Sequence, residues 1–213
     1  GGGFGITGRV VAQTSRIFNE GARDFLGGNA VVRADVEYGP TGLIRFSGVR
    51  LNAPRFRVTR GSGFYDPAGR IAFEADAVST QYGPLSARVT GSVANPVVVL
   101  RAARPGLGVG LSDVQARIVG RGGAYAVTAT GATNYGAFNA DLLVRPGAQL
   151  AIDVRRLLFA GIEASGRVVQ TAAGPFAGGL RFAGSGVSGT VELANQGGYQ
   201  RAVVAARGYN AQI

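Results

Sequence analysis

The sequence predicts an all-β protein, an antiparallel meander of many short strands with one short helix near the N-terminus. Apolar and polar residues alternate with period two in about a dozen runs, the pattern of strands that have one apolar face. Turn-forming residues separate these runs, and glycine supplies 36 of the 213 residues, more than twice its ordinary share. No linker interrupts the pattern, so residues 1–213 are expected to form one continuous segment.

Each strand is expected from the alternation along its own run. In residues 32–38, for example, Val32 and Val36 fall on one face while Arg33, Asp35 and Glu37 fall on the other. The remaining alternating runs lie at residues 44–46, 56–58, 70–77, 85–90, 114–118, 125–130, 138–142, 150–154, 180–182 and 191–193.

Recurring turn residues come directly before several of these runs. Tyr-Gly-Pro occupies residues 38–40 and 82–84, Tyr-Gly-Ala occupies 135–137, and Gly-Pro-Phe occupies 174–176. Glycine and proline in these positions favour tight turns. Turns at such intervals imply consecutive hairpins without crossover helices, and their uneven spacing indicates a loose hairpin repeat.

A helix is expected at about residues 15–26. Phe18, Ala22 and Leu26 recur at helical spacing, Ser15 is a candidate N-cap, and the Gly-Gly pair at 27–28 supplies a left-handed stop. This helix would either pack on the sheet or gate one end of a groove.

The composition argues against most enzyme chemistry. Cys, His, Met and Trp are absent, and all 22 basic residues are Arg. Disulfides, thiol nucleophiles, histidine triads, ordinary zinc sites and Schiff bases are therefore excluded. The two G-x-G-x-x-G matches, at residues 3–8 and 184–189, lack the strand–turn–helix context of a dinucleotide site. We expect a non-enzymatic protein with no cofactor and no metal.

Paired carboxylates are the remaining candidates for acid/base chemistry. Asp35 with Glu37, and Glu74 with Asp76, share strand faces at two-residue spacing. Each face also carries Arg, at positions 33 and 70, which favours a solvated ladder of mixed charge over a catalytic pair.

The net charge of +10 comes from arginines spread over the polar faces of the strands. Aromatic residues fall largely on the opposite faces, whereas a single-strand nucleic-acid binder places its rings beside its cations. We therefore expect no nucleic-acid partner, although anionic lipid headgroups or a negatively charged protein would suit this face. The arginines in question are Arg33, Arg45, Arg55, Arg57, Arg70, Arg88, Arg117 and Arg181.

The apolar faces together make a surface that must be covered. The sheet can close on itself as a sandwich or barrel, face lipid as an outer-membrane barrel, or form an open trough for apolar ligands. The runs are shorter than the roughly 9 to 11 residues of transmembrane strands, and Trp is absent, which disfavours the membrane barrel. A self-packed sheet and an open trough remain.

Three stretches resemble the repeating units of the TamB family, the translocation and assembly module proteins that belong to the AsmA-like group. They are residues 82–100, which begin YGPLSARVTGS, residues 120–141, and residues 174–191. The resemblance covers nearly the whole chain from about Gly8 and consists of degenerate glycine-and-strand patterns.

This resemblance implies an open hydrophobic groove of β-taco shape in the periplasm of Gram-negative bacteria, within a protein anchored in the inner membrane. Such proteins carry phospholipid between the inner and outer membranes and aid outer-membrane protein assembly through TamA. The chain begins with three glycines and has no anchor, so we expect it to be an internal segment. Its expected partners are phospholipid acyl chains and neighbouring β-groove segments of the same chain; TamA would be met through a region outside this segment.

The leading hypothesis is therefore a lipid conduit, and the alternative is a secreted or surface β-structure, such as an adhesin or autotransporter passenger, with a closed core. Under the first hypothesis Phe73→Glu should obstruct transfer, while Arg70→Glu on the polar face should be mild. The candidate groove residues are Val32, Val36, Ile44, Phe46, Phe56, Val58, Ile71, Phe73, Leu85, Val89, Ile118, Val127, Leu142, Ile152 and Phe182.

Overall fold

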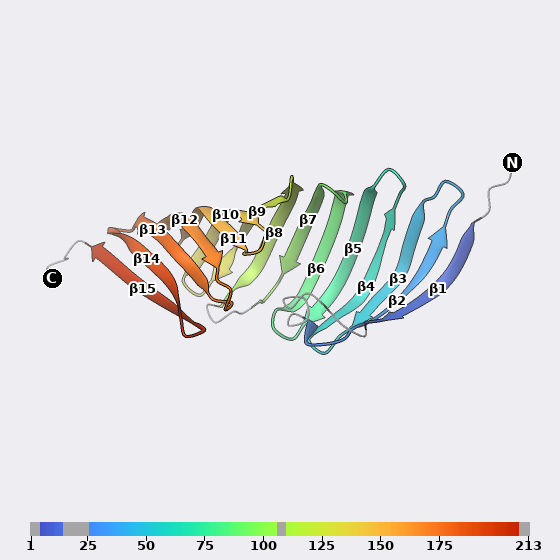
Figure 1. Cartoon of the computed structure of the whole chain (residues 1–213), viewed down its shortest axis with the longest axis horizontal. Helices are drawn as coiled ribbons and strands as arrows, with labels where there is room; N and C mark the ends of the chain where they lie inside the picture. The colour runs from blue at the N-terminus through green and yellow to red at the C-terminus, as the bar shows by residue number, and fades with distance from the viewer. Residues whose placement is uncertain (1–4, 15–25, 106–109, 209–213) are drawn as a thin grey trace. The chain divides into compact units, whose positions relative to one another are not determined.

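The computed structural model describes residues 5–14, 26–105 and 110–208. In this part of the chain, fifteen antiparallel strands form one open, unclosed sheet in which the strand order follows the sequence (Figure 1). The all-β meander predicted from the sequence is therefore confirmed. Residues 15–25 of the predicted helix lie outside the described residues. Leu26 is helical, and Gly27 and Gly28 follow it with φ of 75° and 137°.

The chain divides into two compact units, residues 1–115 and 116–213. The first unit holds seven complete strands, and β8 contains the boundary between the units. The strands are β1 (Ile6–Gln13), β2 (Val31–Tyr38), β3 (Ile44–Asn52), β4 (Phe56–Tyr65), β5 (Arg70–Ser79), β6 (Gly83–Ser92), β7 (Pro96–Ala102), β8 (Ser112–Arg121), β9 (Ala124–Thr133), β10 (Gly136–Arg145), β11 (Ala151–Phe159), β12 (Ile162–Gln170), β13 (Phe176–Gly184), β14 (Val187–Gln196) and β15 (Tyr199–Gly208).

The recurring turn residues lie where consecutive strands connect. The Tyr-Gly-Pro motifs occur at the β2–β3 and β5–β6 connections, Tyr-Gly-Ala at β9–β10, and Gly-Pro-Phe at β12–β13. In the first of these, the Gly39 N–H donates to the Leu43 carbonyl at 2.8 Å. The hairpin interpretation of these motifs is therefore confirmed.

Hydrogen bonds between connections align the hairpins at both ends of the first unit. At one end the Arg55 N–H donates to the Leu26 carbonyl at 2.9 Å, and the Thr80 N–H donates to the Arg55 carbonyl at 3.0 Å. At the other end the Val93 N–H donates to the Gly69 carbonyl at 3.1 Å. These hydrogen bonds join the segments that connect the strands, in addition to the hydrogen bonds between paired strands.

The apolar side chains gather on a sheet surface instead of in an enclosed core. Among the described residues no large side chain is fully buried, and the buried apolar residues are four alanines and two valines. The chain exposes 13749 Å². A compact protein of its 21.7 kDa would expose about 9200 Å². In the described part of the chain, then, no second layer encloses the large apolar side chains.

Candidate apolar binding face

In the first unit, strand register brings the candidate groove residues onto one face, which we call the apolar face. Directly opposed residues in an antiparallel pair point to the same side of a sheet. Val36 lies opposite Phe46, Phe46 opposite Gly63, Gly63 opposite Phe73, and Phe73 opposite Val89. Val98 of β7 continues this row beyond Val89. One line of apolar residues, in which the ring of Phe73 lies against Gly63, therefore crosses six strands.

Two parallel rows hold the other candidates of this unit. One row runs through Val32, Leu51, Val58, Ala77 and Leu85, and Phe56 lies beside it near the end of its strand. The row at the opposite end of the strands runs through Tyr38, Ile44, Tyr65, Ile71 and Gly91. All ten candidates from β2 to β6 thus share the apolar face.

The second unit has an apolar face of its own, built in the same way. Its central row runs through Val127, Leu142, Val154, Gly166, Leu180, Val191 and Val204, from β9 to β15. Ile152 and Phe182 occupy adjacent rows on the same face. Ile118 lies on β8, where it alternates with the exposed Arg117. The register of the described pairs gives no direct partner for Ile118.

Every one of the fifteen candidates is half-buried. Their exposure is intermediate because each side chain is flanked by neighbours on its own face, while no layer covers that face in the described part of the chain. Such a surface retains apolar area that water contacts and that a bound apolar group would cover.

Two aromatic rings lie over glycines of a neighbouring strand. Phe73 Cζ lies 3.1 Å from the position that a Cβ would occupy at Gly61, and Phe73 Cδ2 lies 2.9 Å from the corresponding position at Gly63. Phe182 Cζ lies 2.8 Å from the corresponding position at Gly189. The rings therefore lie along the sheet and cover the glycine backbone, so they project little above the apolar face at these points.

Backbone bulges add residues to the apolar face that alternation alone misses. Gly48, with φ of 57°, adds one residue to β3 between the pairs Asp35–Ser47 and Arg33–Arg50. The even-numbered series that includes Phe46 therefore becomes an odd-numbered series that includes Val49 and Leu51. The bulges thus add Val49, Leu51 and Leu157 to the apolar faces. Register alone also places Val98, Leu100, Val154, Leu180, Val191 and Leu193 there, beside the fifteen candidates.

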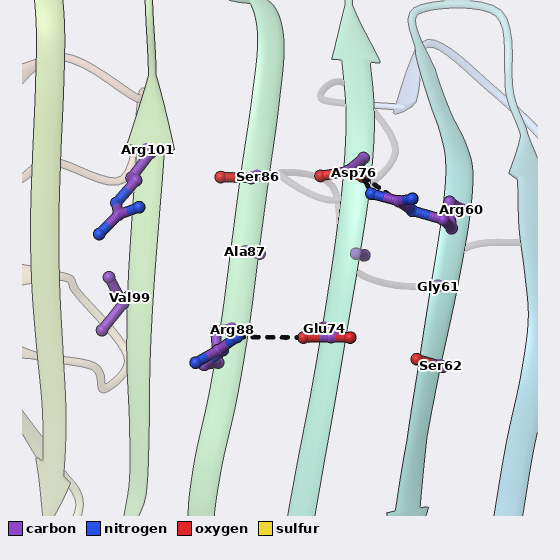
Figure 2. A pocket seen from close by; sticks show the side chains of 11 residues that line it. Arg60, Gly61, Ser62, Glu74, Asp76, Ser86, Ala87, Arg88, Val99 and Arg101 are labelled. Atoms are coloured by element: carbon purple, nitrogen blue, oxygen red, sulfur yellow. Dashed lines mark hydrogen bonds and ion pairs between the residues drawn. The ribbon is translucent and has the colours of Figure 1, made fainter.

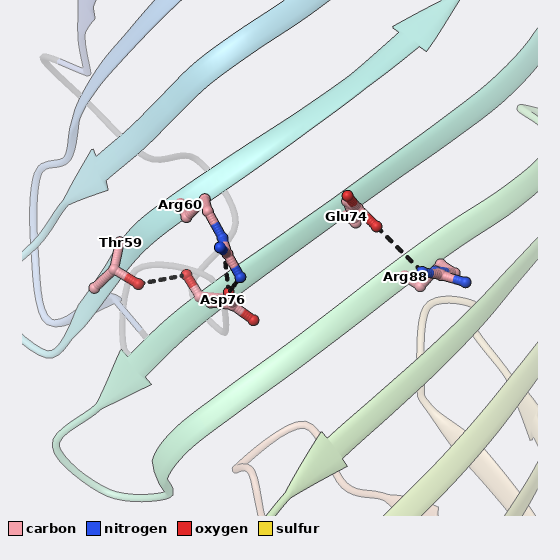
Figure 3. Close-up of polar contacts among 5 residues, drawn as sticks. All are labelled: Thr59, Arg60, Glu74, Asp76 and Arg88. Carbon is pink, nitrogen blue, oxygen red and sulfur yellow. Dashed lines mark hydrogen bonds and ion pairs between the residues drawn. The ribbon is translucent and has the colours of Figure 1, made fainter.

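The opposite side of the sheet, which we call the charged face, carries the ion pairs. In the first unit Asp76 accepts two hydrogen bonds from Arg60, at 3.1 and 2.6 Å, and Glu74 accepts one from Arg88 at 3.2 Å (Figure 3). Asp35 and Glu37 pair with arginines of β1 and β3, at 3.0 and 3.3 Å. The carboxylates thus form the expected ladder of mixed charge, with partners on neighbouring strands.

The described hollows of the surface lie on the charged face of each unit. The hollow in Figure 2 has a volume of about 440 Å³ and is lined by side chains of β4 to β7, including Arg60, Glu74, Arg88 and Arg101. A hollow of about 560 Å³ in the second unit lies around Arg181. Depressions near charged side chains favour hydrated or ionic ligands, whereas the apolar faces favour apolar ones.

Arg70 lies on a polar face but also holds the turn between β4 and β5 in place. Its guanidinium and its backbone N–H both donate to the buried carboxylate of Asp66, in the turn between β4 and β5. Burial acts to raise the pKa of Asp66. The hydrogen bonds from Arg70 and its positive charge together outweigh that effect and hold the pKa below its ordinary value. Arg70→Glu would disturb this turn, so Arg70 is a poor reference position for the charged face.

The described residues hold no cluster of acidic residues able to bind a metal ion, and none of their helices is long and apolar enough to cross a membrane. No protein-family model, curated protein or solved structure matches this chain.

Proposed function

We propose that this chain is a non-enzymatic segment of a TamB-like lipid conduit, which carries phospholipid between the inner and outer membranes through the periplasm. The observation that carries the proposal is the uninterrupted row Val36–Phe46–Gly63–Phe73–Val89–Val98 on a face without a covering layer. Acyl chains would lie on this face and cover it from water.

The dimensions of the row suit an acyl chain. Six strands at about 4.8 Å spacing give a row of about 24 Å. One leaflet of a bilayer has a hydrocarbon thickness of about 15 Å, half of the full core. A chain lying along the row would therefore stay in contact with apolar side chains over its whole length, and each buried methylene contributes about 0.8 kcal/mol.

Passage along such a face requires no bond chemistry. The rows contain aliphatic, aromatic and glycine residues, so a sliding acyl chain meets no side chain that would bind it at one point. The alternative function, a surface β-structure with a closed core, requires a second layer over the same face. The half-buried state of all fifteen candidates favours the conduit.

Photocrosslinking to a radiolabelled phospholipid tests the proposal. A photoreactive residue at Val89 should capture lipid, because Val89 lies in the central row, whereas one at Thr90 should not, because Thr90 is exposed on the charged face. The two positions are consecutive in β6, so they share the same strand and differ by only one residue in their distance from its ends. Equal capture at both positions, or none from the folded protein, would exclude the conduit.

A further inference from the structure

On the charged face of the first unit, three arginines of adjacent strands have no acidic partner among the described residues, a property that they share with Arg101 of β7. Arg33, Arg50 and Arg57 come from β2, β3 and β4, and none of them forms an ion pair or a side-chain hydrogen bond within residues 5–14, 26–105 and 110–208. The acids nearest in register are already occupied, since Asp35 pairs with Arg9 at 3.0 Å and Asp76 with Arg60 at 2.6 Å. Among the described residues, three positive charges on adjacent strands therefore have no acidic partner.

Two of these arginines face each other directly. Arg33 of β2 is the register partner of Arg50 of β3, so their Cβ atoms lie about 4.5–5.5 Å apart. Like charges in directly opposed positions destabilise a sheet. The bulge at Gly48 is responsible, because without the extra residue Val49 would lie opposite Arg33 and Arg50 would point to the apolar face.

Arg50 and Arg57 also line a hollow of about 290 Å³, with Asn52 and Thr59 beside them. Asn52 lies directly opposite Arg57 and two residues from Arg50 on the same strand. The hollow has room for a small anion with part of its hydration shell. No acidic side chain lines this hollow, whereas Glu74 and Asp76 line the larger hollow near Arg101 and would repel an anion there.

We propose that Arg33, Arg50 and Arg57 form a binding site for a phosphate group. A guanidinium presents a planar fork of donors that matches phosphate oxygens, and a phosphate accepts from more than one arginine at once. Its negative charge would offset the repulsion between Arg33 and Arg50. The phosphate group would belong either to a free phosphate or to a lipid headgroup. The site lies on the opposite side of the sheet from the apolar face, so it does not depend on the proposed conduit.

Thermal unfolding in sodium phosphate and in sodium chloride of equal ionic strength tests the site with inorganic phosphate. Arg50→Gln should raise the Tm in chloride, because it removes the like-charge opposition, yet it should lose most of the increase that phosphate gives the unaltered protein. Its affinity for phosphate should fall about tenfold, the effect of losing one charge-assisted contact. Arg45→Gln is the matched control, because Arg45 is exposed on the same face of β3 but already pairs with Glu37 at 3.3 Å.

Flotation with vesicles distinguishes the two sources of phosphate. Vesicles of phosphatidylglycerol and of phosphatidylcholine are compared for the same two variants, which lower the net charge equally. A defect specific to Arg50→Gln with vesicles alone assigns the site to a headgroup, and one with inorganic phosphate alone assigns it to a free anion. Equal behaviour of Arg50→Gln and Arg45→Gln in both assays would overturn the proposal, because the effect would then reflect net charge only.

Discussion

A carboxylate placed in the central apolar row should block acyl-chain binding, and Val89→Glu is the sharpest form of this change. Val89 lies between Phe73 and Val98 in the row, and its side chain is half-buried. If the new carboxylate keeps about three methylenes of a bound chain in water, the loss is about 2.4 kcal/mol at about 0.8 kcal/mol each, roughly a factor of 60 in affinity. Titration with a fluorescent fatty acid measures this loss directly.

Thr90→Glu is the matched control for this substitution. Thr90 is exposed on the charged face, opposite Ala72 and Val97, and Arg88 lies two residues away on the same face. The new carboxylate therefore enters water near a positive charge, and the affinity should stay within about twofold of the original. Urea unfolding of both variants shows whether each remains folded. Equal losses of fatty-acid binding in two folded variants would refute the assignment of the faces.

Two further predictions concern the stability of the sheet. Gly63→Ala should destabilise the protein by about 1–3 kcal/mol in urea unfolding, because its Cβ would clash with the Ala72 carbonyl oxygen. Gly8→Ala, whose Cβ would have nothing within 4 Å, should change stability little. Equal effects would contradict the close approach at Gly63. The pKa of Asp66 is lowered in the folded protein, so the stability that its carboxylate contributes is present above the ordinary pKa of 3.8 and is lost as the pH falls through the folded-state pKa. The free energy of unfolding of Asp66→Asn should therefore differ most from that of the unaltered protein at about pH 6, and progressively less below about pH 4. Urea unfolding across this range measures the convergence, and a difference independent of pH would contradict the role of Arg70.

The sequence predicted the facing of residues wherever a strand runs without interruption. Val36, Phe73 and Val89 were expected on one face from period-two alternation, and register places them in one row. Alternation sufficed here because successive side chains of a strand point to opposite sides of the sheet. It specifies the face of each residue but not its neighbours across the sheet, so the continuity of the rows required the register of the strands.

The sequence could not reveal two other features, and each has a local physical cause. Arg70 alternates with apolar residues like the other arginines, but its partner is the turn residue Asp66, whose burial depends on the closure of the β4–β5 hairpin. The rings of Phe73 and Phe182 lie over glycines of neighbouring strands, and this contact depends on pairing between strands. Glycine abundance alone does not distinguish such covered positions from turn positions.

Bulges determine both faces of the sheet at once. Every strand residue of a single layer points to one of two surfaces, so an unbalanced insertion in a strand exchanges the two faces for all residues beyond it. β3, β4 and β11 each contain one extra residue, near Gly48, Thr59 and Arg155. In each strand the residues of the apolar face have even numbers before the extra residue and odd numbers after it, so they stay on one side of the sheet. The insertion at Gly48 returns Leu51 to the apolar face and, in the same step, places Arg50 opposite Arg33. The apolar facing of Leu51 and the opposition of Arg33 and Arg50 are thus consequences of one backbone feature, expressed on opposite sides of the same strands.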